Sequence, residues 1–420
     1  MNQNDLLQNL AINGGPKTIT KPLPARHHFG EAERNAAVRV INEAMERGDA
    51  PGYGGPEEEA FCKEFAARIG GGYADAVNSG TNSVFVALRS LPIEPFTEII
   101  SGPITDCGGM MPIAMMNCIP VIADSAEDSF NVSVDTIKAV YTERTSAIVV
   151  SHIAGEAADM EPIIAFAKAH NLYVVEDCSQ AHGAKINGKY VGTFGDTAGY
   201  SLMFGKHTCA GGQGGMAFTT KEEYYWKLRQ NSDRGKPFGL PEGSTNCVAS
   251  LNFNMDEIHC AIGRVQTAKM DDIAEKRRKL VKKLFDGIER KDILRSPKLP
   301  ATSEPSYWFT RMIFDVDKVT CDKHTFCEAL SAEGFWVGES YDATPHMYEW
   351  CQKHKAFGNS GYPWAAPEYK GDHNMTYSMG ENISKVYDQN INFFITESFT
   401  DEDIQNIINT VNKVIAAYAK

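Results

Sequence analysis

Residues 146–177 contain the runs SAIVVS (146–151), EPIIAFAKAH (161–170) and LYVVED (172–177), which decide the fold class of this 420-residue chain. The first and last runs are short and mostly apolar, and the middle run has the spacing of a helix. A strand, a helix and a second strand in this order predict two parallel strands joined by a crossover helix. We therefore predict an α/β fold.

The same alternation continues on both sides of this unit. Residues 31–48 and 57–69 have helical periodicity and end at glycines, and residues 80–91 predict a third helix. An Asn-Gly pair inside residues 185–191 predicts a β-hairpin. Further short apolar runs predict strands over residues 73–78, 98–101, 119–124, 200–204 and 215–219. Together these segments predict a mostly parallel sheet that helices cover on both faces.

The pattern changes after Met255. Residues 256–284 form one long helical pattern, and the segments beyond it predict a smaller α+β domain. These segments are strands over 307–314 and 392–395, helices over 323–333 and 401–417, and an irregular region over 342–384. We predict a large domain over residues 1–265 and a small C-terminal domain over residues 266–420, joined by a long helix near 256–285.

The composition is that of an acidic globular protein. The net charge of −13 disfavours non-specific binding to nucleic acid, because such binding depends on Lys and Arg. The ten cysteines form no Cys-x-x-Cys pair, so we predict no metal site and no disulfide framework, but reduced thiols in the cytoplasm. The first residues carry no signal-peptide pattern, and no apolar run has the length of a membrane span.

Several segments place polar residues just after predicted strands, where open parallel sheets bind their ligands. The first is Asn-Ser-Gly-Thr-Asn at residues 78–82. Small residues at the start of a helix leave backbone N–H groups free, which suits a phosphate. Capping of the helix by Ser79 or Thr81 is the alternative.

Asp177 ends the mostly apolar run at residues 172–177. A carboxylate there could hold a ring nitrogen in its protonated form through a charged hydrogen bond, and so keep the ring electron-poor. The spacing of Asp177 and Gln180 also fits the capping box of a helix, which is the alternative.

Residues 201–215, SLMFGKHTCAGGQGG, place one lysine after an apolar run and before four glycines. Burial of the Lys206 amine would lower its pKa and make it a nucleophile that forms Schiff bases with carbonyls. The glycines would let the backbone pass close to a bulky ligand. A surface lysine before a Gly-rich hairpin is the alternative.

The last segment, residues 250–255, places Asn252 and Asn254 on either side of one aromatic residue, and two turn or capping residues are the alternative there. Taken together, the segments supply a phosphate cradle, a carboxylate for a ring nitrogen, a Schiff-base lysine and a second phosphate donor. These are the parts needed for pyridoxal 5′-phosphate (PLP).

The order of these motifs resembles the DegT/DnrJ/EryC1/StrS family, sugar aminotransferases of PLP fold type I. The resemblance covers nearly the whole chain, and the combination of motifs is specific. The motifs include AINGGP (11–16), PGYGG (51–55), AVNSGT (76–81), VEDCSQ (175–180), LNFNM (251–255) and NFFITESFT (392–400). It implies a large domain with a mostly parallel seven-stranded sheet between helices, and a smaller C-terminal α+β domain.

The resemblance also implies roles for individual residues. Lys206 matches the lysine that forms the internal aldimine with PLP, and Asp177 matches the aspartate that pairs with the pyridine nitrogen. Gln180 matches a residue that contacts the ring or its 3-hydroxyl. The phosphate is held at the positions that match Gly80, Thr81 and Ser201.

An asparagine of the partner subunit, matching Asn252 or Asn254, completes the phosphate site in the family, which implies an obligate homodimer. One departure concerns residues 102–109, where many relatives place an aromatic residue over the PLP ring and this chain has none. Stacking on the ring must therefore come from elsewhere or be replaced by a smaller contact.

The reaction implied is a two-step transamination. Glutamate or glutamine gives its amino group, and a keto-sugar, nucleotide-linked or free, or a keto-cyclitol receives it. Some relatives carry histidine in place of the lysine and dehydrate a sugar, so Lys206 favours the aminotransferase over a PLP-dependent dehydratase or lyase. A PLP-binding regulator without turnover is the remaining alternative. Arg26, His27 and Arg234 are candidates to hold the diphosphate of a nucleotide sugar.

Overall fold

The computed structural model describes residues 2–420 and confirms the α/β fold class. Its centre is a seven-stranded sheet in the order β1-β9-β8-β5-β4-β2-β3. The strands are β1 (Tyr73–Val77), β2 (Glu98–Ser101), β3 (Ile119–Ile122), β4 (Thr145–Ser151), β5 (Tyr173–Asp177), β8 (Thr197–Ser201) and β9 (Gly215–Thr219). Only β9 runs against its neighbours, so the sheet is mostly parallel, as predicted.

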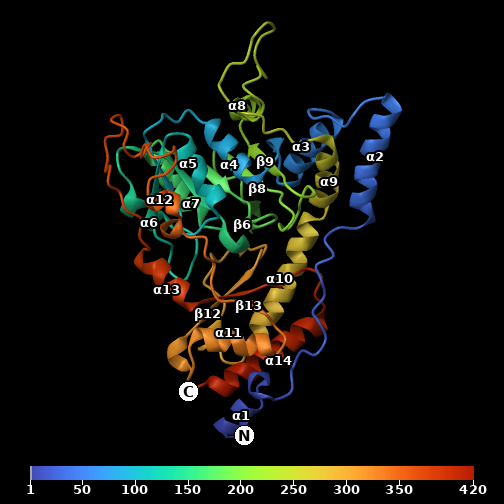
Figure 1. Cartoon of the computed structure of the whole chain (residues 1–420), viewed down its shortest axis with the longest axis vertical. Coiled ribbons are helices and arrows are strands. Elements are labelled where there is room, and N and C mark those ends of the chain that lie inside the picture. Colours follow the sequence, from blue (N-terminus) through green and yellow to red (C-terminus); the bar gives the residue numbers. More distant parts are fainter. Residues whose placement is uncertain (1) are drawn as a thin grey trace.

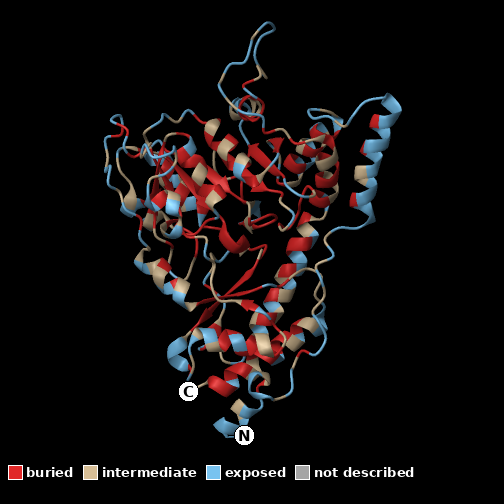
Figure 2. Ribbon diagram, viewed as in Figure 1, coloured by how far each residue is buried: buried red, intermediate tan, exposed pale blue. Residues whose placement is uncertain are grey.

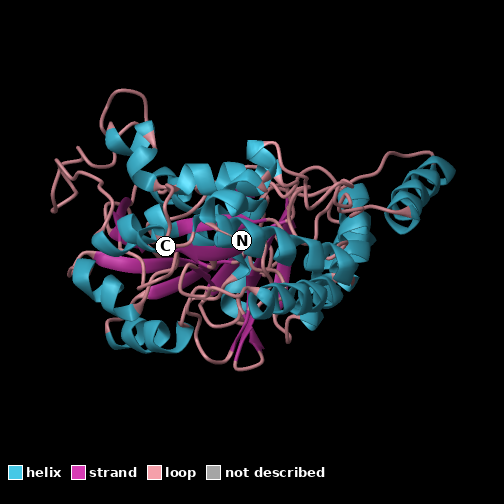
Figure 3. Ribbon diagram, turned by 90° about the horizontal axis from the view of Figure 1, so that it is seen from below, coloured by secondary structure: helices cyan, strands magenta, loops and turns pink. Residues whose placement is uncertain are grey.

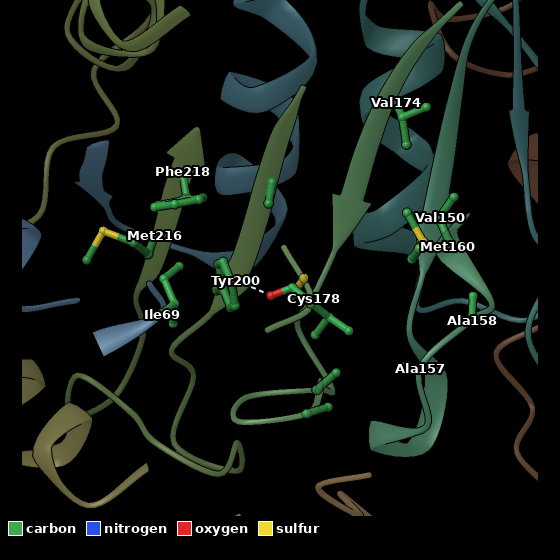
Figure 4. Packing of buried hydrophobic residues seen from close by; sticks show 14 of the residues in the cluster. Ile69, Val150, Ala157, Ala158, Met160, Val174, Cys178, Tyr200, Met216 and Phe218 are labelled. Atoms are coloured by element: carbon green, nitrogen blue, oxygen red, sulfur yellow. Dashed lines mark hydrogen bonds between the residues drawn. The ribbon is translucent and has the colours of Figure 1, made fainter. Parts of the chain in front are cut away.

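Helices cover both faces of this sheet, because alternate residues of its strands point in opposite directions (Figure 3). Val174 of β5 packs in one buried cluster with Tyr200 and Met160, which Figure 4 shows, whereas Val175 packs in a second cluster on the other face. The first face is covered by α3 (Pro56–Arg68), α6 (Val134–Val140), α7 (Met160–Ala169) and α9 (Glu257–Ala268). The second is covered by α4 (Gly80–Arg89), α5 (Cys107–Met115) and α8 (Glu222–Ser232).

A second, four-stranded antiparallel sheet has the order β10-β12-β14-β13 and its own buried core. Its strands are β10 (Leu294–Arg295), β12 (Thr310–Phe314), β13 (Val337–Gly338) and β14 (Asn390–Phe393). It packs with α1 (Gln3–Gln8), α10 (Met270–Gly287), α11 (Lys323–Ala332) and α14 (Asp401–Tyr418) in the lower part of Figure 1. Figure 2 shows buried residues in both sheets. The predicted boundary at residues 265–266 stays a prediction.

The single long helix expected near 256–285 is wrong in one respect, since two helices, α9 and α10, meet at Lys269. The Lys269 N–H bonds to the carbonyl of Gln266, three residues back, which ends α9. The Lys269 side chain turns to Glu33 of α2 (Glu31–Arg47). No glycine or proline marks the break, so helical periodicity alone could not reveal it.

Most remaining predictions on local structure overlap observed elements, although the strand predicted over 200–204 lies at 197–201 and that predicted over 307–314 begins at Thr310. The hairpin is formed by β6 (Lys185–Ile186) and β7 (Lys189–Tyr190), and Asn187 and Gly188 both have the positive φ that its turn requires. A short strand, β11 (Ser303–Glu304), pairs with β6. The region 342–384 is mostly irregular apart from α12 (Glu349–Gln352) and the start of α13 (Glu381–Gln389). Within residues 2–420, no helix combines the length and apolarity that crossing a membrane requires.

Candidate active site

A cavity of about 180 Å³ lies at the carboxyl ends of β4, β5 and β8. Ser151 of β4 stands opposite Asp177 of β5, and Asp177 stands opposite Gly199 of β8, so the three strands end side by side. Six of the eight predicted site residues line this cavity, namely Gly80, Thr81, Asp177, Gln180, Ser201 and Lys206. The six residues therefore meet at the carboxyl edge of the sheet, as expected for ligand sites of open parallel sheets, and their roles stay a prediction.

Lys206 is buried, with only 6% of its surface exposed, so the interpretation as a surface lysine is wrong. Burial lowers the pKa of Lys206 to about 8, against the opposing influence of the negative charges of Asp177 and Asp106. At pH 7 about a tenth of such an amine is unprotonated and nucleophilic, far more than for an ordinary lysine. Its Nζ atom lies 3.9 Å from the centre of the Trp308 ring, which gives the protonated amine a cation–π contact.

Asp177 lies at the floor of the cavity and is also buried. One carboxylate oxygen, Oδ1, accepts the Ser179 N–H at 3.0 Å, and the other, Oδ2, lies 3.5 Å from the Ser151 hydroxyl. No helix begins after Asp177, so the capping-box alternative is wrong. Gln180 instead accepts the Ala154 N–H at 2.9 Å and donates to the Tyr341 hydroxyl at 2.8 Å. These bonds fix which end of the Gln180 amide faces the cavity as a donor.

The start of α4 forms one end of the cavity. Ser79 caps the helix by accepting the Asn82 N–H at 3.2 Å, so the capping alternative is correct for this residue. Gly80 and Thr81 remain at the helix N-terminus beside Ser201, where backbone N–H groups and the helix dipole favour an anion. Gly80 is required for this contact, since a Cβ atom there would lie 2.4 Å from the Cβ of Ser201.

Gly108 and Gly109 also line the cavity, in the segment where the expected aromatic residue is missing, and Gly108 lies against Thr81 of α4. A Cβ atom on Gly109 would lie 2.7 Å from Asp177 Oδ2 and 2.4 Å from the Thr105 hydroxyl. These distances are too short for any real contact, so a side chain here would occupy the space above the Asp177 carboxylate.

Gly109→Ala is therefore expected to weaken binding of the cofactor by at least about tenfold, the equivalent of about 1.4 kcal/mol. The matched control is Gly102→Ala in the same segment, where a Cβ atom would meet only ordinary contacts, the nearest at 3.4 Å. Fluorescence titration of each purified variant with PLP measures the effect. Equal affinities for the two variants would contradict this assignment of the cavity.

Asn252 and Asn254 do not line the cavity. They lie on the surface beside the exposed loop that follows α8, and the Asn254 amide donates to the Asn252 side-chain oxygen at 2.7 Å. That loop projects away from the body at the top of Figure 1. The predicted role of the two residues in a neighbouring subunit stays a prediction.

Several residues of the site come from segments that sequence patterns did not single out. Trp308 and Tyr341 belong to the C-terminal part of the chain and approach Lys206 and Gln180. Asp106 lines the cavity and caps α5 by accepting the Gly108 N–H at 2.9 Å. The only sequence signal for Trp308 was its place in the aromatic run at residues 307–309, just before a strand. Such a run does not distinguish a residue of the site from a residue of the core.

His152, which lines the cavity, forms a buried group of potential metal ligands with Glu176 and Cys178. His152 Nδ1 accepts the Ala158 N–H, and its Nε2–H donates to Glu176 at 3.1 Å. Glu176 also accepts three backbone N–H groups, from Gly192, Phe194 and Gly195. Because these groups already satisfy one another, we assign the group a structural role that orients His152.

Comparisons with known proteins agree with this geometry. The model of the DegT/DnrJ/EryC1/StrS aminotransferase family matches residues 31–412. The chain belongs to this aminotransferase family. A putative L-glutamine:3-amino-2,3-dideoxy-scyllo-inosose aminotransferase of Micromonospora echinospora is 28% identical, with 78% of each chain covered. A GDP-perosamine synthase of Escherichia coli O157:H7 is 33% identical over 53% of this chain and 60% of its own.

Among solved structures, an aminotransferase from Psychrobacter cryohalolentis superimposes with a TM-score of 0.79 and 27% identity, covering 96% of this chain and 99% of that chain. The chain is therefore an aminotransferase of the PLP-dependent fold, and membership of the family implies PLP as its cofactor. The predicted family and fold type are both confirmed.

Proposed function

We propose that this aminotransferase uses PLP to move an amino group from glutamate or glutamine to the keto group of a sugar or cyclitol. The observation that carries the proposal is the buried Lys206 amine, which shares one cavity with the Asp177 carboxylate and the N-terminus of α4. Burying a lysine amine with no carboxylate in hydrogen-bonding contact lowers the stability of the folded protein. Such a residue is therefore a candidate for a catalytic role.

The residues of the cavity fit PLP. The α4 N-terminus, Gly80, Thr81 and Ser201 would hold its phosphate, Asp177 its ring nitrogen, and Lys206 its aldehyde carbon. The glycines support this fit, because side chains at Gly80 or Gly109 would fill the space that the group needs. When bound, PLP supplies an electron-poor ring that accepts the electrons released as a C–H bond of the amino donor breaks.

The protein contributes proton transfer and electrostatics. Lys206, once released, removes the proton from the α-carbon of the donor and returns a proton during the second half of the reaction, since its pKa of about 8 suits both roles. The Asp177 carboxylate, buried and held by Ser179, keeps a positive charge on its partner nitrogen. Gln180 presents its amide as a donor from the side of the cavity.

The acceptor is proposed at the level of a keto group on a polyhydroxylated ring. The two relatives described above are named for a scyllo-inosose and for a GDP-linked sugar, which share that chemistry. Of the predicted diphosphate-binding candidates, Arg26 is bonded to Glu397 and Arg234 to Asp233 and Tyr53 within the same chain. Because both guanidinium groups already have partners in this chain, neither is free to serve as the main binding group for a diphosphate.

The test is a two-stage transamination with the purified protein and PLP. Incubation with glutamate should release 2-oxoglutarate in an amount equal to the enzyme, and addition of a keto-cyclitol or keto-sugar should then make the reaction catalytic. Mass spectrometry of the aminated product identifies the acceptor. Failure of every amino acid to yield its keto acid would contradict the proposal.

We further propose a homodimer in which Asn252 or Asn254 reaches the phosphate in the partner's cavity. Asn252 is exposed and Asn254 is half-buried, and both lie beside the projecting loop, which supports this arrangement. The ten cysteines, unpaired throughout the described chain, support the predicted cytoplasmic location.

Complementation between inactive variants tests the shared site. Lys206→Ala and the double variant Asn252→Ala/Asn254→Ala are each expected to be inactive, but mixed dimers hold one intact site. Random mixing should restore activity to about a quarter of wild type, because half the dimers are mixed and each has one good site of two. Recovery of no activity after subunit exchange would show that each chain completes its own site.

A further inference from the structure

The loop that carries Lys206 is flexible by composition. Gly205 precedes the lysine, and four more glycines follow between residues 211 and 215. Glycine loses the most conformational freedom on ordering, so such a loop needs restraints from elsewhere to hold one position. The reaction is sensitive to that position, since a displacement of about 1 Å can cost about a hundredfold in rate.

Backbone hydrogen bonds within the segment, such as Lys206 N–H to Met203 O at 2.9 Å, supply some restraint, and further restraints come from outside the seven-stranded sheet. Three consecutive backbone carbonyls of the loop each accept a hydrogen bond from a distant segment. The Trp308 ring N–H donates to Gly205 O at 2.9 Å. The two terminal nitrogens of Arg26 donate to Lys206 O at 2.6 Å and to His207 O at 2.7 Å.

Arg26 is itself held by an ion pair. Its Nε–H donates to Glu397 at 2.8 Å. The carboxylate therefore binds the Nε edge of the guanidinium, while the terminal nitrogens bind the loop. Glu397 also pairs with Arg277 of α10 at 2.7 Å, and the Ser398 hydroxyl donates to Arg26 O at 2.5 Å. The Arg277 side chain is almost fully buried, whereas Arg26 and Glu397 are only partly exposed, at 19% and 12% of their side-chain surface.

Three distant parts of the chain therefore meet beside the Lys206 peptide. Arg26 lies in the N-terminal segment, Glu397 follows β14, and Arg277 lies in α10. We infer that Arg26 is a positioning residue for Lys206, whose planar guanidinium, oriented by Glu397, fixes the peptide that carries the lysine and so directs its amine into the cavity. This inference rests on the proposed function, because the role of Lys206 is part of it.

The chemistry of arginine explains why this residue type is needed. A guanidinium presents donors in a rigid fork, so one side chain can bind two successive carbonyls and a carboxylate at once. A lysine at position 26 would keep the charge but lose the fork. Because Arg26 contacts only carbonyl oxygens of the loop, it acts on the position of Lys206 and does not touch the reacting atoms.

The rate of covalent attachment of PLP to Lys206 tests the inference without relying on turnover. Wild type, Arg26→Ala, Arg26→Lys, Glu397→Gln and the control Arg278→Ala are prepared free of cofactor and mixed with PLP. Attachment is followed by the visible band and by borohydride trapping with mass spectrometry. Arg278 is a matched control because it donates to Pro305 O at 3.3 Å in the neighbouring segment and has no bond to the lysine loop.

We expect attachment to slow by about 10- to 100-fold in Arg26→Ala and Arg26→Lys, and less strongly in Glu397→Gln, with Arg278→Ala unchanged. Added guanidinium ion, below denaturing concentration, should restore much of the rate in Arg26→Ala. A purely structural role would lower the melting temperature but leave the rate for folded protein unchanged.

If Arg26→Ala fails to fold, the rate of PLP attachment in Arg26→Lys tests the inference instead. Wild-type attachment rates in folded Arg26 variants would overturn the inference. A wild-type protein that never attaches PLP would overturn the proposed function and this inference with it, whereas slow attachment by the variants alone supports both.

Discussion

Lys206→Ala is expected to abolish covalent attachment of PLP and to reduce transamination by more than about a thousandfold. The variant loses the nucleophile that holds the cofactor and the group that moves the proton, and proton transfer alone is worth about 10²- to 10⁴-fold. Borohydride trapping followed by mass spectrometry measures attachment, and release of 2-oxoglutarate from glutamate measures activity.

The matched control is Lys221→Ala. Lys221 lies 15 positions further along the chain, is half exposed and pairs with Asp196 at 2.5 Å on the protein surface. Its loss should leave both measurements close to wild type. Retention of most activity by Lys206→Ala would show that this lysine is not the catalytic group.

Asp177→Asn should produce the second largest effect, with a pattern that differs from that of Lys206→Ala. The amide is nearly isosteric and can still accept the Ser179 N–H, but it lacks the charge that keeps the partner nitrogen protonated. A hydrogen bond to a charged group contributes about 1.5–3 kcal/mol, so we expect turnover to fall by about 10- to 100-fold or more.

The visible band of the lysine-bound cofactor should still form in Asp177→Asn, because Lys206 is intact. This separates the two variants, since attachment survives in one and is lost in the other. Asp135→Asn removes an equal charge from an exposed position that pairs only with Lys138, and it should behave as wild type. Full activity of Asp177→Asn would mean that the charge has no part in the reaction.

The sequence was most informative where local pattern and sheet geometry act together. Apolar runs set the strands, and the ends of parallel strands meet at one edge, so Asp177, Ser201 and Lys206 could be placed in one site before the structure was known. The small residues at 78–82 were likewise assigned to a helix N-terminus with free backbone N–H groups, whereas the close approach of Gly80 to Ser201 emerged only in the structure.

Contacts between distant segments could not be predicted in this way. Arg26 meets the Lys206 peptide across 180 positions of sequence, and Trp308 meets Gly205 across 103. Such pairs depend on how distant segments of the chain pack together, which leaves no periodic signal in either segment. Helix α8 had no predicted counterpart for a related reason, because its polar and aromatic residues do not form a clear apolar stripe.

The visible absorption spectrum of the purified protein with PLP, before and after glutamate, tests the central claim most directly. We predict a yellow band that forms in wild type, is absent in Lys206→Ala, and bleaches when glutamate is added. A protein that forms no band, or a band of equal intensity in Lys206→Ala, would contradict the assignment of Lys206 as the residue that holds the cofactor.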